Sequence, residues 1–312
     1  MTSRSEFVPY RGVFPIAPTP FKEDESLDME GQTRVLDCMI DQNVDGICIL
    51  ANYSEQFLLN DAERDQLLKI CLEHIAGRVP VIVTCSHFST RISVARARQA
   101  EAVGADMIMV MPPYHGTALR ASEQGNFAFF QELADAISIP IMLQDAPLSG
   151  VSLSVPFLAD LARRIPQIGY FKIEVPGAAA KLRNLISVGG AAIKGPFDGE
   201  EAITLMADLE AGATGTMPSA LLPELIRPVV TDYLAGKTTQ AAKTYARILP
   251  LINFENRQCG LRATKTVMKE GGVIKSDTVR HPLEALHPEP RRQLLQQAAA
   301  LDVLALTWGN SS

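Results

Sequence analysis

Short apolar segments rich in β-branched residues alternate along this chain with longer segments whose apolar residues recur at helical spacing. The first pattern is typical of buried strands, and the second of amphipathic helices. The strand pattern occurs at 12–18, 46–50, 79–85, 106–112, 139–145, 169–173, 190–195 and 213–217. The segments between them open with Asn, Asp or Ser and close with Gly, as helices do. This repetition of strand and helix predicts an α/β fold, a closed (β/α)8 barrel of the TIM type.

The rest of the chain has a purely helical pattern and predicts a C-terminal helical extension of the barrel. Helices are expected over 220–235, 238–257, 259–270 and 283–306. The first would close the barrel, so we expect a barrel over 1–235 and an extension over 236–312, packed together as one compact unit. A doubly wound open sheet is the alternative. No G-x-G-x-x-G motif follows the first strand, which argues against the dinucleotide-binding form of that sheet.

Composition narrows the classes of function. The chain has 312 residues, of which 47% are hydrophobic and 21% charged, as in ordinary globular proteins. A net charge of −6 gives no reason to expect nucleic acid or an anionic membrane as a partner. We expect neither a signal peptide nor a membrane span, because no long apolar run is present. The five cysteines are scattered without CxxC pairs, as expected of small core residues in a reducing cytoplasm.

Candidate site residues follow from the predicted barrel, because the chemistry of such barrels is carried out at the C-terminal ends of the strands. Polar residues gather at the ends of six predicted strands. They are Asn52, Tyr53, Ser54 and Glu55; Ser86 and His87; Tyr114 and His115; Gln144 and Asp145; Lys172 and Glu174; and Lys194.

Lys172 is the most informative of these residues, because it interrupts the apolar strand segment GYFKI. A buried ammonium is unfavourable unless it is paired or loses its proton. Side chains alternate along a strand, so Lys172 and Glu174 share one face. One interpretation is a structural salt bridge. The other, which we favour, is an imine-forming lysine whose pKa is lowered by an apolar pocket.

The other candidates have weaker signals. Lys194 is an amine of the same kind, but its Gly and Pro neighbours are equally consistent with an outward-pointing side chain. Tyr114 serves either packing or catalysis, and His87 is equally consistent with a loop that leads into a helix. The histidines form neither HxH nor HExxH, and no P-loop is present, so we expect no metal site.

The motifs GVFPIAPTPF, ANYSEQF, MPPYHG, QDAP, YFKIE and GPFDGEEA resemble those of the dihydrodipicolinate synthase / N-acetylneuraminate lyase family. The resemblance covers essentially the whole chain, including the helical extension. It implies a (β/α)8 barrel in which a strand-six lysine forms a Schiff base with the ketone of pyruvate or another 2-keto acid, and Lys172 falls at that position. It also implies a homotetramer built from tight dimers, with neither metal nor organic cofactor.

Two motifs depart from the usual family pattern. The loop after strand two usually reads G-[ST]-T-G-E and here is Ala-Asn-Tyr-Ser-Glu at 51–55. The strand-five motif usually carries a catalytic tyrosine in Y-N-x-P and here is Gln-Asp-Ala-Pro at 144–147, whereas the tyrosine after strand four remains as Tyr114. These departures resemble a branch of the family that dehydrates 2-keto-3-deoxy sugar acids in non-phosphorylated pentose breakdown.

The chemistry of Gln144 favours the same branch. Aldol cleavage needs a base for the C4 hydroxyl, and an amide has no titratable proton to serve as one. Dehydration instead removes a proton from C3, which the iminium at C2 makes acidic, and then protonates the departing C4 hydroxyl. Glu174, on the lysine's face, is placed to do both in turn. We therefore predict a hydro-lyase with Lys172 as nucleophile and Glu174 as acid–base.

The remaining roles rest on position in the family motifs. Ser54, with Asn52, Tyr53 and nearby backbone N–H groups, is expected to bind the substrate carboxylate. Tyr114 is grouped with the catalytic residues and, with Gln144, is expected to hold the sugar hydroxyls. The competing hypotheses are a pyruvate-dependent aldolase or synthase, a dehydratase for a six-carbon acid, and a barrel that binds a keto acid without turnover. A pure binder has no need of a nucleophilic amine.

Overall fold

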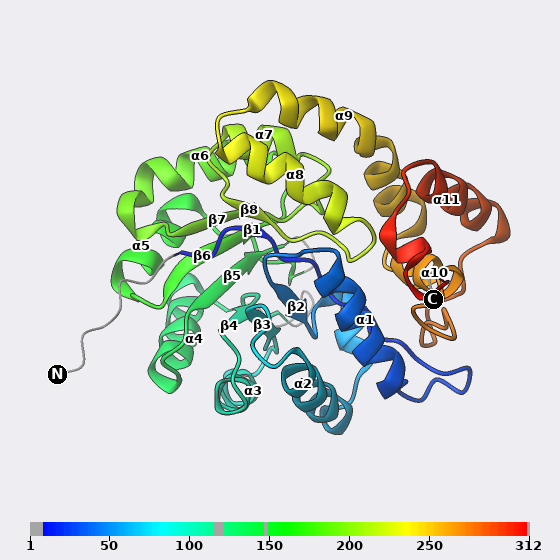
Figure 1. Cartoon of the computed structure of the whole chain (residues 1–312). Helices are drawn as coiled ribbons and strands as arrows, with labels where there is room; N and C mark the ends of the chain where they lie inside the picture. Colours follow the sequence, from blue (N-terminus) through cyan, green and yellow to red (C-terminus); the bar gives the residue numbers. More distant parts are fainter. Residues whose placement is uncertain (1–8, 115–120, 147–148, 311–312) are drawn as a thin grey trace.

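The structure, a computed structural model, describes residues 9–114, 121–146 and 149–310 (Figure 1). The described residues form a parallel sheet of eight strands in the order β1-β8-β7-β6-β5-β4-β3-β2. Single bridges from Ile16 to Cys48 and to Ser219 close the ring beside β1. The strands are β1 (Gly12–Val13), β2 (Ile47–Ile49), β3 (Val81–Thr84), β4 (Met107–Val110), β5 (Ile141–Asp145), β6 (Ile168–Ile173), β7 (Gly195–Asp198) and β8 (Gly215–Thr216). The predicted (β/α)8 barrel is confirmed.

One predicted strand is misplaced. The segment 190–195 continues the preceding helix as the 3-10 turn η4 (Gly190–Ala192), and β7 begins only at Gly195. The apolar residues before that glycine have the pattern of a strand, but the first of them form a 3-10 turn at the end of the preceding helix. This shift moves Lys194 to the start of β7 and moves the following acidic residues to its C-terminal end.

A helix follows each strand and covers the outside of the barrel (Figure 1). Local sequence fixes where these helices begin. Asn60 accepts a hydrogen bond from the backbone of Glu63, whose carboxylate accepts one from the backbone of Asn60, a reciprocal capping box. The helices are α1 (Met29–Asp41), α2 (Asp61–Ile75), α3 (Thr90–Ala102), α4 (Glu123–Ala136), α5 (Val155–Arg164), α6 (Ala178–Gly189), α7 (Leu205–Glu210) and α8 (Pro223–Leu234).

Three further helices form the C-terminal extension, which lies to one side of the barrel in Figure 1. They are α9 (Thr238–Phe254), α10 (Arg262–Glu270) and α11 (Pro288–Ala300). A π-helical turn, η5 (Glu255–Cys259), joins the first two of them where the sequence predicts one helix up to residue 257. Such turns are rare and occur often at functional sites.

The interior of the barrel is a packed core of its own. It is filled by Phe14, Ile16, Cys48, Ala51, Ile82, Met107, Met109, Met142, Tyr170, Phe197 and Met217. At the N-terminal end of the barrel, the Tyr170 hydroxyl accepts a hydrogen bond from the backbone N–H of Tyr10 at 3.1 Å. The barrel is therefore filled rather than open, and polar chemistry is confined to its C-terminal mouth.

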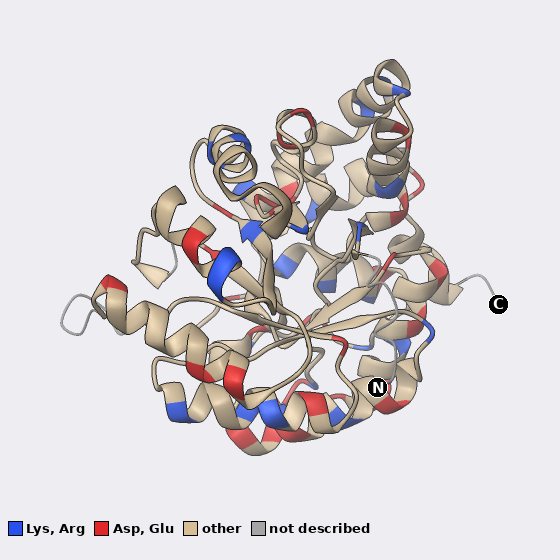
Figure 2. Cartoon of the chain, turned by 90° about the vertical axis from the view of Figure 1, so that its left-hand side faces the viewer, with Lys and Arg blue, Asp and Glu red and all other residues tan. Residues whose placement is uncertain are grey.

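Charged residues of both signs are interspersed along the outer helices in the view of Figure 2. This distribution agrees with the modest net charge of the chain. None of the described helices combines the length and the apolar character needed to cross a membrane.

Candidate active site

Lys172 lies on β6 with only 1% of its side chain exposed. Its register partners are Gln144 on β5 and Phe197 on β7, and Phe197 belongs to the barrel interior. The Lys172 Nζ atom lies 3.0 Å from Glu174 Oε2, and the Gln144 side-chain amide donates to the same oxygen at 2.8 Å. The structure therefore brings together three of the residues that the sequence singles out. They meet because side chains alternate along β6, which puts Lys172 and Glu174 on one face, and because Gln144 pairs with Lys172 across the sheet.

A second carboxyl group faces the same amine. Glu201 Oε1 lies 3.5 Å from Lys172 Nζ, and 11% of the Glu201 side chain is exposed. Burial alone would lower the pKa of Lys172, but Glu174 and Glu201 outweigh it, so the pKa is raised above the ordinary lysine value. The prediction of a lowered pKa is wrong in this structure. A lysine so paired is an ammonium until a neighbouring carboxylate takes its proton.

The turn that presents Glu201 is strained and held in place. Glu201 and Ala202 have φ values of 55° and 66°, in the left-handed region that costs a residue with a side chain about 1–2 kcal/mol. The buried Asp198 carboxylate accepts hydrogen bonds from the backbone N–H groups of Glu200 (3.0 Å) and Ala202 (2.9 Å). A Cβ on Gly199 would lie 2.7 Å from the Ile173 carbonyl oxygen, so the close approach of this turn to β6 requires glycine.

The loop after β2 forms two 3-10 turns, η1 (Asn52–Ser54) and η2 (Gln56–Leu58). The Ser54 hydroxyl donates to the Ala17 carbonyl at 2.6 Å and accepts from the Ala51 N–H, so its proton is engaged within the loop. The Asn52 side-chain oxygen accepts from Gln56 at 2.7 Å. In this conformation Ser54 shapes the loop, and the backbone N–H groups at the start of η1 have no partner within that turn.

Tyr53 points from that loop toward the C-terminal extension. Its hydroxyl donates to the Asn256 side chain at 2.8 Å, which places the π-helical turn η5 beside the mouth. Burial raises the pKa of Tyr53, and Glu201, Glu255 and Glu174 raise it further. Burial also raises the pKa of Glu255 to about 7, against hydrogen bonds to Ser219 and Thr264. The extension thus brings the carboxyl group of Glu255 to the mouth, beside Glu174 and Glu201.

Tyr114 and His87 belong to a neighbouring group. With Gln56, Phe57, Leu59, Ser86, Phe88 and Arg96 they line a cavity of about 370 Å³. The Tyr114 ring meets Phe57 edge to face, and burial raises the pKa of Tyr114 to about 12. His87 stacks on Phe88 and accepts from the Ser89 N–H, as a residue of a loop leading into α3 would. His115 lies outside the described residues.

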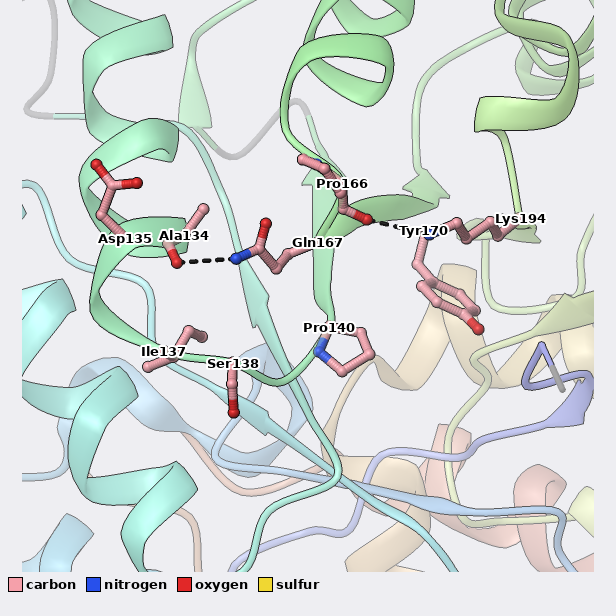
Figure 3. Close-up of a pocket in the computed structure, with 9 residues that line it drawn as sticks. All are labelled: Ala134, Asp135, Ile137, Ser138, Pro140, Pro166, Gln167, Tyr170 and Lys194. Carbon is pink, nitrogen blue, oxygen red and sulfur yellow. Dashed lines mark hydrogen bonds between the residues drawn. The ribbon is translucent and has the colours of Figure 1, made fainter. Parts of the chain in front are cut away.

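Two candidates do not join this group of side chains. Asp145 ends β5, but its buried carboxylate forms an ion pair with Lys181 of α6, so it fastens a helix to the sheet. Lys194 is exposed at the opposite end of the barrel and donates to the Pro166 carbonyl oxygen at 3.0 Å (Figure 3). It lines a cavity of about 790 Å³ with Tyr170, Gln167 and residues of the α4–β5 connection. Its placement at a strand end near the site is wrong, because β7 begins after it.

Sequence reasoning missed Glu201, Glu255 and Asn256. The Glu-Glu pair at 200–201 would have been found if β7 had been placed at 195–198, since both residues then follow a strand end. The π-helical turn leaves no comparable pattern in the sequence. Within the part of the chain that the structure describes, no group of three or more His, Cys, Asp or Glu side chains is arranged to hold a metal ion.

Comparisons with known proteins agree with this arrangement. The model of the family described as "Dihydrodipicolinate synthetase family" matches residues 9–301. The chain is 54% identical over 301 residues to an L-2-keto-3-deoxyarabonate dehydratase of Azospirillum brasilense, covering 96% of this chain and 97% of that one. It is 29% identical to 4-hydroxy-tetrahydrodipicolinate synthase 2 of Streptomyces coelicolor, covering 94% and 95% of the two chains.

Solved structures show the same fold. A candidate dihydrodipicolinate synthetase of Pseudomonas aeruginosa superposes with a TM-score of 0.88 at 28% identity, covering 93% of this chain and 99% of that one. A dihydrodipicolinate synthase of Acinetobacter baumannii, solved with pyruvate, superposes with a TM-score of 0.87 at 22% identity, covering 94% and 99% of the two chains. The likeness extends over the barrel and into the helical extension.

Proposed function

Since the chain belongs to the dihydrodipicolinate synthetase family and is an enzyme of the lyase class, we propose that it is a Schiff-base-forming dehydratase of 2-keto-3-deoxy sugar acids. The substrate we favour is L-2-keto-3-deoxyarabonate, which would yield α-ketoglutarate semialdehyde. The identity of 54% to a dehydratase of that name supports this choice. The reaction belongs in non-phosphorylated pentose breakdown in the cytoplasm.

One observation carries the dehydratase proposal more than any other. The Glu174 carboxylate lies between the Lys172 amine at 3.0 Å and the Gln144 amide at 2.8 Å. An acid–base group therefore adjoins the nucleophile, whereas the neighbouring strand offers only an amide. That set of groups suits proton removal beside an imine. It does not suit deprotonation of a C4 hydroxyl by the strand-five residue.

The reaction begins at the amine. Glu174 accepts a proton from the Lys172 ammonium, and the neutral amine attacks C2 of the substrate. Glu174 passes that proton to the ketone oxygen and then relays a second proton from the attached nitrogen to the same oxygen. Water leaves, and the iminium forms with Glu174 again ionised. The iminium withdraws electrons from C3, and Glu174 takes the C3 proton. The C4 hydroxyl takes a proton from an acid of the site and leaves as water. A proton then moves from C5 to C3 to give an enol at C4–C5, hydrolysis frees Lys172, and ketonisation leaves C5 as an aldehyde.

The other residues orient the substrate in this proposal. Backbone N–H groups of the β2 loop, in the segment of Asn52, Tyr53 and Ser54, bind the carboxylate. Gln144 holds a sugar hydroxyl, and Tyr114 borders the distal part of the site. No metal or organic cofactor takes part, because the iminium is the electron sink. The assembly expected of the family is a homotetramer of tight dimers.

A panel of five- and six-carbon 2-keto-3-deoxy sugar acids tests the proposal. Each acid is assayed for the semialdehyde and for pyruvate with the same preparation of enzyme. We expect semialdehyde as the main product of the five-carbon acid with the L-arabinose configuration. Pyruvate as the main product would establish an aldolase instead. Substrate binding without either product would establish a barrel that binds keto acids only.

A further inference from the structure

Two carboxyl groups lie close to the Lys172 amine, and they differ in their surroundings. Glu174 receives hydrogen bonds from Lys172 and Gln144, and 25% of its side chain is exposed. Glu201 lies 3.5 Å from the amine and is more deeply buried. Among the described residues, Glu201 Oε2 is buried and has no hydrogen-bond partner. Two carboxyl groups in such different environments are suited to two different roles.

The surroundings of Glu201 as a whole favour its protonated form. The titratable groups that face it are Lys172 and Glu174 from β6, Asp198 from β7, Glu255 from η5, and Tyr53 from the β2 loop. Burial raises the pKa of Glu201, Lys172 opposes that rise, and the three carboxyl groups add to it, so that the pKa is about 8. At neutral pH, Glu201 is therefore a carboxylic acid with a proton to donate, while the Lys172 amine donates its hydrogen bond to Glu174.

The backbone around Glu201 is consistent with a functional position. Two successive residues, Glu201 and Ala202, hold left-handed conformations, and the buried Asp198 carboxylate anchors the turn. Strain of this kind persists only when its surroundings impose it, and it gathers at active sites. The strained turn delivers a buried acid to within 3.5 Å of the predicted nucleophile.

We propose that Glu201 is the second acid–base residue of this site, protonating the departing C4 hydroxyl while Glu174 removes the C3 proton. This inference rests on the proposed dehydratase function and divides its proton transfers between two groups. C4 is two bonds from C2, the carbon that becomes bonded to Lys172 Nζ. Acids flanking that nitrogen are therefore close to the reacting carbons.

The proton transfers balance over the cycle. Glu174 takes the C3 proton, the C4–O bond breaks, and the hydroxyl leaves as water with the proton from Glu201. Glu201, now ionised, takes a proton from C5, while Glu174 returns its proton to C3. Both groups regain their starting states, and the product imine carries an enol at C4–C5. Hydrolysis of the imine and ketonisation of the enol give the keto acid with an aldehyde at C5.

The test compares leaving groups in the Glu201→Gln variant, with Glu200→Gln as the matched control. The substrates are 4-hydroxy-2-oxobutanoate, which loses water, and 4-fluoro-2-oxobutanoate, which loses fluoride without needing a proton. We expect Glu201→Gln to lose roughly a hundred- to ten-thousandfold in water elimination, as is typical of a missing general acid, and to keep the wild-type rate of fluoride release. Deuterium exchange into the methyl group of pyruvate should persist, because it needs only Lys172 and Glu174.

Three results would overturn the assignment: equal losses for water and fluoride, unchanged water elimination, or loss of pyruvate exchange in Glu201→Gln. If that variant does not fold, the wild-type pH profile decides. Water elimination should fall as pH rises through about 8, where Glu201 ionises, while fluoride release should not, and parallel profiles would refute the role. A wild type that converts none of the sugar acids contradicts the proposed substrate, whereas the oxobutanoate pair still tests Glu201.

Discussion

Two buried lysines of this chain each pair with a glutamate, and the two regions around them differ in how completely the amine is enclosed. Lys265 of α10 forms an ion pair with Glu55, and both side chains are essentially inaccessible to solvent. Its Nζ also donates to the Thr278 carbonyl at 2.8 Å and lies 4.3 Å from the centre of the Phe21 ring. Lys172 is equally buried, but its partner Glu174 is a quarter exposed.

The pKa is lowered in Lys265, which we take to be structural, and raised in Lys172, which we take to be the nucleophile. Burial lowers the pKa of Lys265 to about 8, against the attraction of Glu55. The pKa of Lys172 is raised despite burial, because two carboxyl groups face it. A criterion of low pKa alone would choose Lys265 as the nucleophile. Access and an adjacent proton acceptor instead favour Lys172, whose neighbour Glu174 reaches solvent.

The largest effect on activity separates Glu174 from a merely structural partner. Glu174→Gln keeps the shape of the side chain but loses the base. We therefore expect turnover to fall by roughly a hundred- to ten-thousandfold, with substrate affinity less affected. Exchange of the pyruvate methyl protons should fall with it. Prolonged incubation with borohydride should still trap the pyruvate adduct, because Lys172 is intact and Glu201 also faces its amine. A folded variant that exchanges these protons at the wild-type rate would remove Glu174 from the mechanism.

The buried ion pair of Lys265 and Glu55 should matter for stability rather than for catalysis. Lys265→Met leaves Glu55 buried without its partner, so we expect the free energy of unfolding to fall by about 3–5 kcal/mol. The double variant Glu55→Gln with Lys265→Met removes both charges and should recover much of the loss. Denaturant unfolding measures both effects. A folded Lys265→Met protein that forms no adduct with pyruvate would show that this lysine has a role in the reaction.

The smallest expected effect concerns Glu255, the buried carboxyl that the extension brings to the mouth. Its native pKa of about 7 lies above the unfolded value, so below about 4.5 both states hold the proton and no penalty arises. Between about 4.5 and 7 the native state binds more protons than the unfolded state, and stability declines as pH rises. Glu255→Gln should therefore stabilise the protein by about 2 kcal/mol more at pH 8 than at pH 5.

Thermal or denaturant unfolding at both pH values checks this prediction. The exposed Glu132→Gln variant is the control, and it should show no comparable change with pH. Equal effects of Glu255→Gln at the two pH values would mean that Glu255 is ionised in the native state throughout. The raised pKa that we assign to Glu255 would then be wrong.

The sequence could predict that Lys172 and Glu174 share a face because strand alternation is a local rule, and it could predict Gln144 because that residue lies at the end of a predicted strand. It could not predict the sign of the lysine's pKa shift, because that depends on Glu201, which a different strand supplies. The sequence analysis missed Glu201 because it placed the seventh strand at 190–195. The first residues of that segment form a helical turn, and β7 begins only at Gly195. The contribution of Asn256 and Glu255 depends on a π-helical turn, and the engaged hydroxyl of Ser54 depends on Ala17, some distance away in sequence.

The most direct test of the account is to find which lysine forms the imine. The wild-type protein is incubated with pyruvate and borohydride, and the adduct is located by peptide mapping and mass spectrometry, with Lys172→Met and Lys265→Met measured in parallel. We predict one adduct at Lys172, its loss in Lys172→Met, and its retention in Lys265→Met. An adduct at Lys265 or Lys194 in the wild type, or trapping that survives Lys172→Met, would contradict the assignment of Lys172 as the nucleophile.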